Sequence, residues 1–227
     1  MAGRKNFVSG SILTASDVNS FLMDQSVMVF DDSAARGSAI PTPSEGMVTY
    51  RKDQKVVETF DGSAYRPVGG LVAVKHALKT NIFSASVTSG NNVAVTGLSI
   101  THAMQDPNNK LIISISFGSL SNSVNRSDMS LGVHDGAGLI AIGDAAGSRS
   151  RVTAGGFYAG GDALGVTSPS ITFVHEPNDT TSRTYTARVI NNRTDTVTLN
   201  VNTANRNSDN IQDARSVSSF VIQEVAV

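Results

Sequence analysis

The 227-residue sequence predicts a mainly β protein, in which a short helix and a small β-hairpin precede an antiparallel β-sandwich or barrel. One observation is a change of pattern at Gly69-Gly70, from apolar residues at helical spacing to short alternating runs. Another is a composition with abundant Ser, Thr, Asn and Gly and only 16% charged residues. We therefore expect two domains, residues 1–70 and residues 71–227.

The first predicted element is a helix with one narrow apolar face. Thr14 is suited to the N-cap, and Asp17 three residues later can complete a capping box. Four apolar residues then fall at helical spacing, namely Val18, Phe21, Leu22 and Met28. This stripe is too narrow to bury itself, so we expect it to contact a partner surface. Packing on the chain's own hairpin is the alternative.

A second short helical turn and a hairpin follow. The turn is predicted over residues 34–39, and the prolines at 41 and 43 end it because each disfavours the α region for its predecessor. Residues 47–50 and 56–60 predict two strands, which the Asp61-Gly62 turn signal follows. A hairpin of this size is marginally stable alone. We expect it to pack on the preceding helix or on other copies of the chain.

From residue 71 onward, short β-rich runs alternate with turn residues, and no helical window separates them. The clearest predicted strands span residues 71–77, 93–100, 110–117, 129–134, 139–143, 171–175, 184–190, 196–201 and 216–225. This spacing favours an antiparallel sandwich or barrel. Residues 154–164 contain glycines on both sides of Phe157-Tyr158, and we expect a long loop there.

Composition argues against several classes of partner. The net charge is −1, whereas a nucleic-acid binder usually carries a basic patch or excess. The absence of cysteine excludes disulfide and thiol chemistry and fits folding in a reducing cytoplasm. No apolar run approaches the roughly 20 residues that cross a bilayer, and no signal-peptide core follows the basic start. We expect neither nucleic-acid binding nor membrane insertion.

No arrangement of residues predicts catalysis. The four histidines are scattered, and Pro177 after His175-Glu176 excludes a metalloprotease helix. His134-Asp135 can form an acid–base pair, although Asp135-Gly136 first indicates a hairpin turn. The Asp/Asn clusters at 106–109 and 209–213 can offer oxygens to calcium, but turn chemistry explains both. We expect no enzyme activity and no catalytic, cofactor-binding or metal-binding residue.

The N-terminal motifs, taken in order, carry a family resemblance. They are residues 13–19, 28–30, 33–36 and 41–47, followed by Phe60-Asp61-Gly62-Ser63. This ordered set resembles the head of tailed-bacteriophage tail-fibre and minor tail proteins over residues 7–68. The C-terminal part is similar, at residues 185–189 and 218–225, to the jelly-roll tips of such proteins. Those tips resemble C1q and tumour-necrosis-factor domains and assemble as trimers.

The resemblance implies a homotrimeric structural protein of the virion, made in the host cytoplasm. Residues 1–70 are then a virion-attachment module that binds other tail, baseplate or capsid proteins. Residues 71–227 are a jelly-roll β-sandwich that contacts the host surface and its glycans. A tail fibre or baseplate appendage is the first hypothesis, and a capsid decoration protein or head fibre is the alternative. A depolymerase would need two opposed carboxylates, and no spacing singles out such a pair.

The expected receptor contacts lie in the glycine-rich segment. Phe157 and Tyr158 place two aromatic rings there, in a chain with only 6% aromatic residues. Aromatic faces can pack on sugar C–H groups, while Arg149, Arg151 and Asp162 can add polar contacts. The alternative is that Phe157 and Tyr158 pack inward or between subunits.

Overall fold

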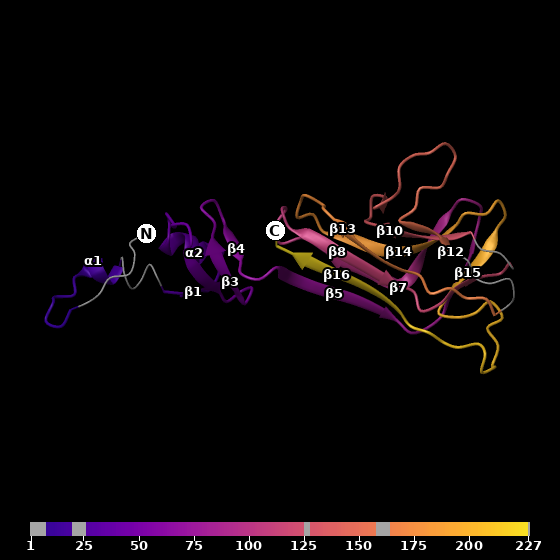
Figure 1. The fold of residues 1–227 in the computed structure, drawn as a ribbon, viewed down its shortest axis with the longest axis horizontal. Coiled ribbons are helices and arrows are strands. Elements are labelled where there is room, and N and C mark those ends of the chain that lie inside the picture. The colour runs from indigo at the N-terminus through magenta and orange to yellow at the C-terminus, as the bar shows by residue number, and fades with distance from the viewer. Residues whose placement is uncertain (1–7, 20–25, 125–127, 158–163, 227) are drawn as a thin grey trace. The chain divides into compact units, whose positions relative to one another are not determined.

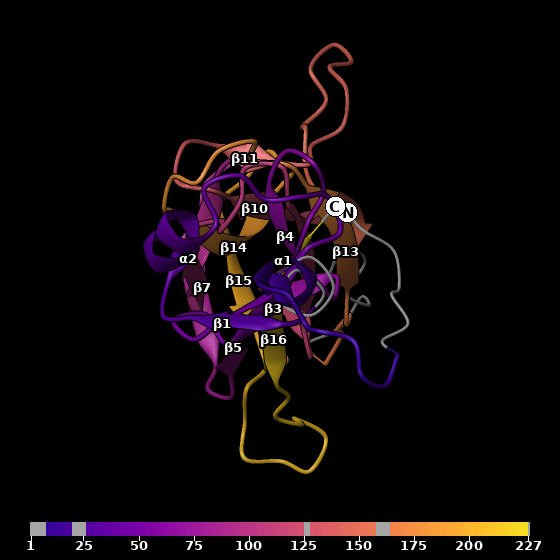
Figure 2. The ribbon, with the colours of Figure 1, turned by 90° about the vertical axis from the view of Figure 1, so that its left-hand side faces the viewer.

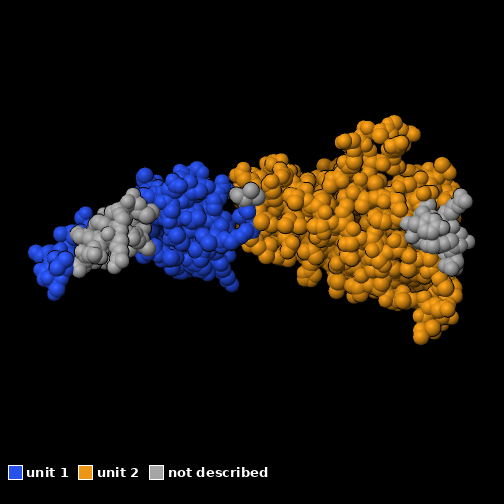
Figure 3. All heavy atoms as spheres, in the orientation of Figure 1, with its two compact units in different colours: residues 1–70, 226 blue, residues 71–225, 227 orange. Residues whose placement is uncertain are grey.

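The computed structural model describes residues 8–19, 26–124, 128–157 and 164–226 (Figure 1). The chain divides into two compact units, residues 1–70 with residue 226 (unit 1) and residues 71–225 with residue 227 (unit 2), which Figure 3 colours separately. The described residues are mainly β, and their only two helices are short and lie in unit 1. A mainly β fold with antiparallel sheets is therefore confirmed.

Unit 1 begins with the predicted capping box. The backbone N–H of Asp17 donates to Thr14 Oγ1 at 3.1 Å, and the Thr14 N–H donates to Asp17 Oδ2 at 3.4 Å. The helix that they cap, α1, is only four residues long, Ala15–Val18.

Met28 does not belong to the helical stripe predicted for it. It is the first residue of strand β1, Met28–Phe30, which pairs in parallel with strand β2, Val48–Arg51. The prediction of one helical face through Val18 and Met28 is therefore wrong. The apolar residues Met28–Phe30 pair their backbone groups with strand β2, whose partner residues are Thr49, Tyr50 and Arg51, which local spacing cannot reveal. Phe21 and Leu22 lie outside the described residues.

The sheet of unit 1 has the order β1-β2-β3-β4, with β3 at Val56–Phe60 and β4 at Tyr65–Pro67. Helix α2, Ser33–Ala39, forms where the second helical turn is predicted. Asp32 is its N-cap, because its Oδ1 accepts the Ala35 N–H at 2.8 Å.

One face of this small sheet is held by a polar network instead of an apolar core. The buried carboxylate of Glu58 accepts a hydrogen bond from Arg36 of α2 and lies 3.3 Å from Arg51 Nη1. The Arg36 guanidinium also stacks 3.8 Å from the ring centroid of Tyr65. Among the described residues of unit 1, Met47 is the only buried apolar residue, and it is 7% exposed. Unit 1 therefore buries little apolar surface within one chain.

Unit 2 contains three sheets, of order β13-β8-β16-β5, β11-β10-β14-β7 with β12 added beside β10, and β6-β15-β9. Their strands are β5 Leu71–Lys79, β6 Phe83–Val87, β7 Asn92–His102, β8 Lys110–Ser116, β9 Leu120–Asn122, β10 Met129–His134, β11 Leu139–Ile140, β12 Ala154–Phe157, β13 Ser170–His175, β14 Arg183–Asn191, β15 Val197–Val201 and β16 Ser218–Val225. All the pairings between these strands are antiparallel.

The two larger sheets of unit 2 share one core. Ile113 and Phe220 come from the first sheet, Leu98 and Tyr185 come from the second, and all four belong to one buried cluster. Between β5 and β16 the chain passes repeatedly from one of these sheets to the other. This arrangement is compatible with a jelly-roll β-sandwich.

Strand β12 replaces part of the loop that the glycines predict. A Cβ on Gly155 would lie 2.8 Å from Ser130 Oγ, so only glycine lets this strand approach β10 so closely. Gly156 has φ +76°, a conformation that other residues rarely adopt. The expectation of a loop is therefore wrong for Ala154–Phe157.

Candidate functional site

One regular surface of unit 2 is the side of the four-stranded β13-β8-β16-β5 sheet that faces away from the core. Residues such as Ile113 and Ile222 point inward and are buried, so their neighbours along each strand point outward. Twelve outward residues form three rows across the four strands, which are Val174–Ile112–Gln223–Val74, Thr172–Ser114–Val221–His76 and Ser170–Ser116–Ser219–Leu78. We call these twelve residues the outer face, and Figure 1 shows the four strands side by side.

The outer face is nearly free of charge. None of its twelve residues is Asp, Glu, Lys or Arg, and His76 is its single titratable group. Val174, Val74 and Leu78 are 56%, 52% and 60% exposed. The hydroxyls of Ser114 and Thr172 hydrogen-bond each other at 2.9 Å, and most of the other side chains of the outer face are Ser, Val, Leu or Ile. Such a surface is suited to packing against another uncharged surface and unsuited to acid–base chemistry.

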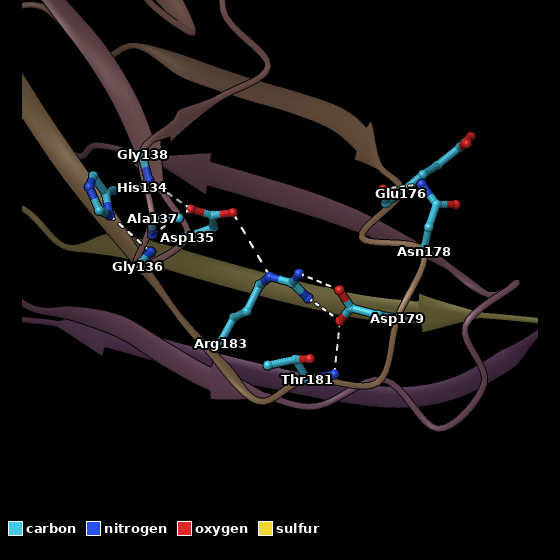
Figure 4. Close-up of polar contacts among 10 residues, drawn as sticks. All are labelled: His134, Asp135, Gly136, Ala137, Gly138, Glu176, Asn178, Asp179, Thr181 and Arg183. Atoms are coloured by element: carbon cyan, nitrogen blue, oxygen red, sulfur yellow. Dashed lines mark hydrogen bonds and ion pairs between the residues drawn. The ribbon is translucent and has the colours of Figure 1, made fainter.

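A polar cluster lies where β10 ends and β14 begins (Figure 4). Arg183 donates to both carboxylate oxygens of Asp179, each at 2.6 Å. Asp135 lies 3.9 Å from Arg183 Nε, and its Oδ1 accepts the N–H groups of Ala137 and Gly138 at 2.9 and 3.0 Å. These bonds close the hairpin turn between β10 and β11 and tie it to the segment before β14.

The charges of this cluster are stabilised by their partners. The hydrogen bonds from Arg183 and from the Thr181 N–H hold the pKa of Asp179 well below its ordinary value. Burial acts to raise the pKa of Asp135, but the N–H groups of its turn and the Arg183 charge outweigh burial and lower it. His134 accepts the Gly136 N–H at 2.9 Å. His134 and Asp135 thus bond to the turn and to Arg183, an arrangement that stabilises structure.

A second polar cluster is fully enclosed. The Glu224 carboxylate is 0% exposed and accepts hydrogen bonds from Asn109 Nδ2 at 2.6 Å and from the Gln105 N–H at 2.8 Å. Its Oε2 also lies 2.8 Å from Nε2 of the buried His102. A carboxylate beside a histidine is a common catalytic pair, but a substrate cannot reach atoms that are removed from solvent. This cluster therefore closes the end of the sandwich instead of performing chemistry.

His175 is half-buried against the edge of Tyr185, with ring centroids 5.9 Å apart. Its Nε2 is buried and has no hydrogen-bond partner among the described residues. Burial lowers the pKa of His175, and Arg183 adds to this effect, while Asp135 and Glu176 oppose it. Burial also raises the pKa of Tyr185 to about 12. The environment of His175 and Tyr185 therefore favours the neutral form of both side chains.

We expect unit 2 to lose stability as the pH falls from 7.5 to 5.5. Because the pKa of His175 is lower in the folded chain than in the unfolded one, the unfolded chain binds the proton more tightly. The contribution of His175 to the free energy of unfolding is complete above its pKa in the unfolded chain. It is lost as the pH falls from there toward its pKa in the folded chain. His175→Gln should show a smaller drop in melting temperature between these pH values. An equal drop in wild type and variant would contradict this assignment, and His134→Gln tests for a general effect of losing a histidine.

The structure separates the residues predicted for receptor contact. Arg149 and Arg151 are exposed in the segment between β11 and β12, which projects from unit 2 (Figure 2). Arg151 Nε donates to the Gly143 carbonyl oxygen at 2.6 Å, within the same segment. Phe157 lies opposite Met129 in strand β12 and packs, partly buried, against the core. Tyr158 and Asp162 lie outside the described residues, so the recognition role stays a prediction.

Two further findings concern chemistry and membranes. In the described parts of the chain, no three His, Asp or Glu side chains are grouped so that they can hold a metal ion. Over the same residues, no helix is long and apolar enough to cross a membrane.

Comparison with known proteins adds little. No family model and no curated protein matches the chain. A solved structure described as infectious bursal disease virus, Gx strain, is similar over 74% of this chain, with 14% sequence identity and a TM-score of 0.32. This chain covers 42% of the viral chain, which is less than half of its length. A similarity of this kind carries no argument about function.

Sequence reasoning missed the outer face, although a signal for it exists. Strands β8 and β16 alternate buried apolar residues with outward ones, and exposed positions of this kind are usually charged when they face water. Here most outward positions of these two strands are filled by uncharged residues such as Ser114, Ser219 and Val221, and the only charged one is Lys110 at the start of β8, which pairs with Glu176. A half-buried strand whose outward side is mostly uncharged predicts a second contact surface.

Proposed function

We propose that this protein is a structural component of a tailed-phage virion, a tail-fibre or baseplate appendage that assembles as a homotrimer and has no enzyme activity. The observation that carries the assembly is the outer face, whose twelve residues include no Asp, Glu, Lys or Arg and whose edge residues Val74, Leu78 and Val174 are exposed in the single chain. The phage context rests on the ordered N-terminal motifs of residues 7–68. In this proposal unit 2 is a jelly roll of the C1q type.

The chemistry of the outer face favours identical partners. A face without charged side chains offers no electrostatic complement to a charged surface, whereas hydroxyl and methyl groups pack equally well on their own kind. Burying Val74, Leu78 and Val174 removes apolar area from water, which stabilises an assembly by about 25 cal/mol for each Å² buried. Three copies also present three sets of projecting loops, so weak contacts with a host surface gain avidity.

Unit 1 is the proposed attachment module. Its N-terminal segment leaves Ile12 87% exposed, and Leu13 beside it is also exposed. Exposed apolar side chains of this kind mark contact sites when they gather in one segment. Partners of this segment in the proposal are other virion proteins, and the half-buried Val18 at the end of α1 is the remaining described residue of the predicted helical stripe.

The mass and copy number of the full chain test this proposal. Light scattering at micromolar concentration should give three times the 23.7 kDa chain mass, and a monomer or dimer would contradict the homotrimer. Densitometry of purified particles should then find a few trimers per virion. Hundreds of copies would instead place the protein on the capsid, as a decoration protein or head fibre. Absence from particles would overturn the virion role.

A further inference from the structure

Unit 2 contains a buried lysine without a counter-ion. Lys79 is the last residue of β5 and is only 4% exposed. Its neighbour Leu78 belongs to the outer face, so Lys79 points to the opposite side of the sheet, where Gly97 of β7 lies beside its amino group. A lysine is almost never buried to this extent unless its charge is paired. A partner for the Lys79 amino group is therefore expected.

The described chain supplies this amino group with one neutral acceptor. Nζ donates to Asn81 Oδ1 at 2.8 Å, whereas an ammonium group carries three donors. Among the described lysines, ion pairs form at Lys52 and Lys110, and none forms at Lys79. Residues 71–102, which include β5, β6 and β7, contain no Asp or Glu. A change of side-chain rotamer on these strands therefore cannot bring a carboxylate to Lys79.

Buried hydrogen bonds fix the turn that carries Lys79 and Asn81. Asn202 is 0% exposed, and its Nδ2 donates to the carbonyl oxygens of Lys79 at 2.8 Å and of Asn81 at 3.1 Å. The Ser218 hydroxyl donates to Asn202 Oδ1 at 2.5 Å and so holds the amide in this orientation. The two polar side chains are thus positioned before a ligand arrives, which lowers the entropy cost of binding one.

Glycine at position 97 leaves room beside the amino group. A Cβ on Gly97 would meet one described non-hydrogen atom within 4 Å beyond its chain neighbours, and that atom is Lys79 Nζ at 3.8 Å. Asn81, Thr96 and Gly97 are all exposed. The space beside Nζ therefore opens to solvent, although the lysine itself is enclosed.

We propose that Lys79 forms an anion site whose ligand is a small oxyanion group, a phosphate or a carboxylate. The ligand oxygens accept the two Nζ donors that Asn81 leaves free, and the negative charge neutralises the buried lysine. The Asn81 amide group offers further donors at the exposed side of the site. Such an oxyanion is either a free ion or a substituent on a larger molecule such as a sugar. The site lies within one chain, so it does not depend on the proposed homotrimer.

Thermal unfolding of the full chain with inorganic phosphate tests this site. At an ionic strength held constant with NaCl, phosphate should raise the melting temperature of wild type by about 2–4 °C, because a ligand that binds only the folded chain stabilises it. Lys79→Met removes the donors, keeps an unbranched side chain in the buried position, and should abolish this shift. Lys75→Met is the matched control and should keep the shift, because Lys75 lies on the same strand but is exposed and donates to the Thr101 carbonyl oxygen.

Asn81→Asp tests the same site without removing the lysine. The substitution replaces the amide that accepts from Lys79 by a carboxylate, so an internal counter-ion takes the place of the ligand. This variant should melt above wild type in NaCl alone, and phosphate should no longer raise its melting temperature. It keeps the proposal testable if Lys79→Met does not fold.

Three results would overturn the site. They are the absence of a phosphate shift in wild type, an equal shift in wild type and Lys79→Met, and a full phosphate shift in Asn81→Asp. Acetate and glucose 6-phosphate, measured beside phosphate, distinguish the two sources of the oxyanion. A shift with glucose 6-phosphate that Lys79→Met abolishes would support a ligand carried on a sugar. A shift with phosphate and acetate alone would support a site for free ions.

Discussion

Two glutamates on the outer face, Leu78→Glu with Val174→Glu, are expected to convert the homotrimer into monomers. Leu78 lies on edge strand β5 and Val174 on edge strand β13, so the pair charges both margins of the sheet. Both side chains are more than half exposed in the single chain, so the substitutions should cost the isolated fold little. In the assembly the two glutamates would bury unpaired carboxylates, and each costs roughly several kcal/mol of desolvation free energy. An interface of ordinary size cannot offset this cost.

The matched control places the same charges on the other sheet. Ser99→Glu with Thr184→Glu alters outward positions of β7 and β14. Ser99 and Thr184 are exposed and lie outside the outer face. Light scattering should give a single-chain mass for the first double variant and a trimeric mass for the control. A trimer that survives Leu78→Glu and Val174→Glu would place the contact on another surface.

Removal of the enclosed carboxylate by Glu224→Ala is expected to lower the free energy of unfolding by about 3–5 kcal/mol, because three donors lose their acceptor at once. Asn109 and His102 would keep buried donors without an acceptor, and the partly buried Gln105 N–H would also lose its partner. Denaturant unfolding at one fixed protein concentration measures the loss, since oligomer stability depends on concentration.

Glu176→Ala serves as the control for this prediction. Glu176 also pairs with a cation, lying 2.8 Å from Lys110 Nζ, but the Lys110 and Glu176 side chains are 41% and 51% exposed. Exposed pairs contribute about 0–1 kcal/mol, so this variant should unfold close to wild type. Equal effects of Glu176→Ala and Glu224→Ala would show that the enclosed cluster contributes no more to the free energy of unfolding than an exposed ion pair.

Most strands of unit 2 could be predicted because their signal is local. Residues 110–117 and 216–225 alternate apolar and polar side chains, and they form β8 and β16 with nearly the predicted bounds. Strand β6 was missed although its sequence alternates apolar and polar side chains, whereas β9 and β12 were missed because Ser, Asn and Gly dominate them. Small side chains carry no periodic apolar signal, and these strands form because a neighbouring strand offers them backbone partners.

The candidate site depended on information that is not local. Rows such as Thr172–Ser114–Val221–His76 combine four strands that are far apart in the sequence. The alternation of side chains predicts that Val221 points to the opposite side from Ile222, but it does not predict which residues of other strands lie beside Val221. The helical stripe failed for the same reason, since β1 is defined by its partner β2 and by no pattern of its own.

The sequence by itself determined the β-rich class, the capping box at Thr14 and the strands whose side chains alternate, because each of these depends on residues within a few positions. It also determined the lack of thiol chemistry, since no cysteine is present. Only the tertiary structure decided the order of the strands, the enclosure of Glu224, and the uncharged outer face of unit 2. Those features arise from pairings between distant segments, where register selects which outward side chains become neighbours.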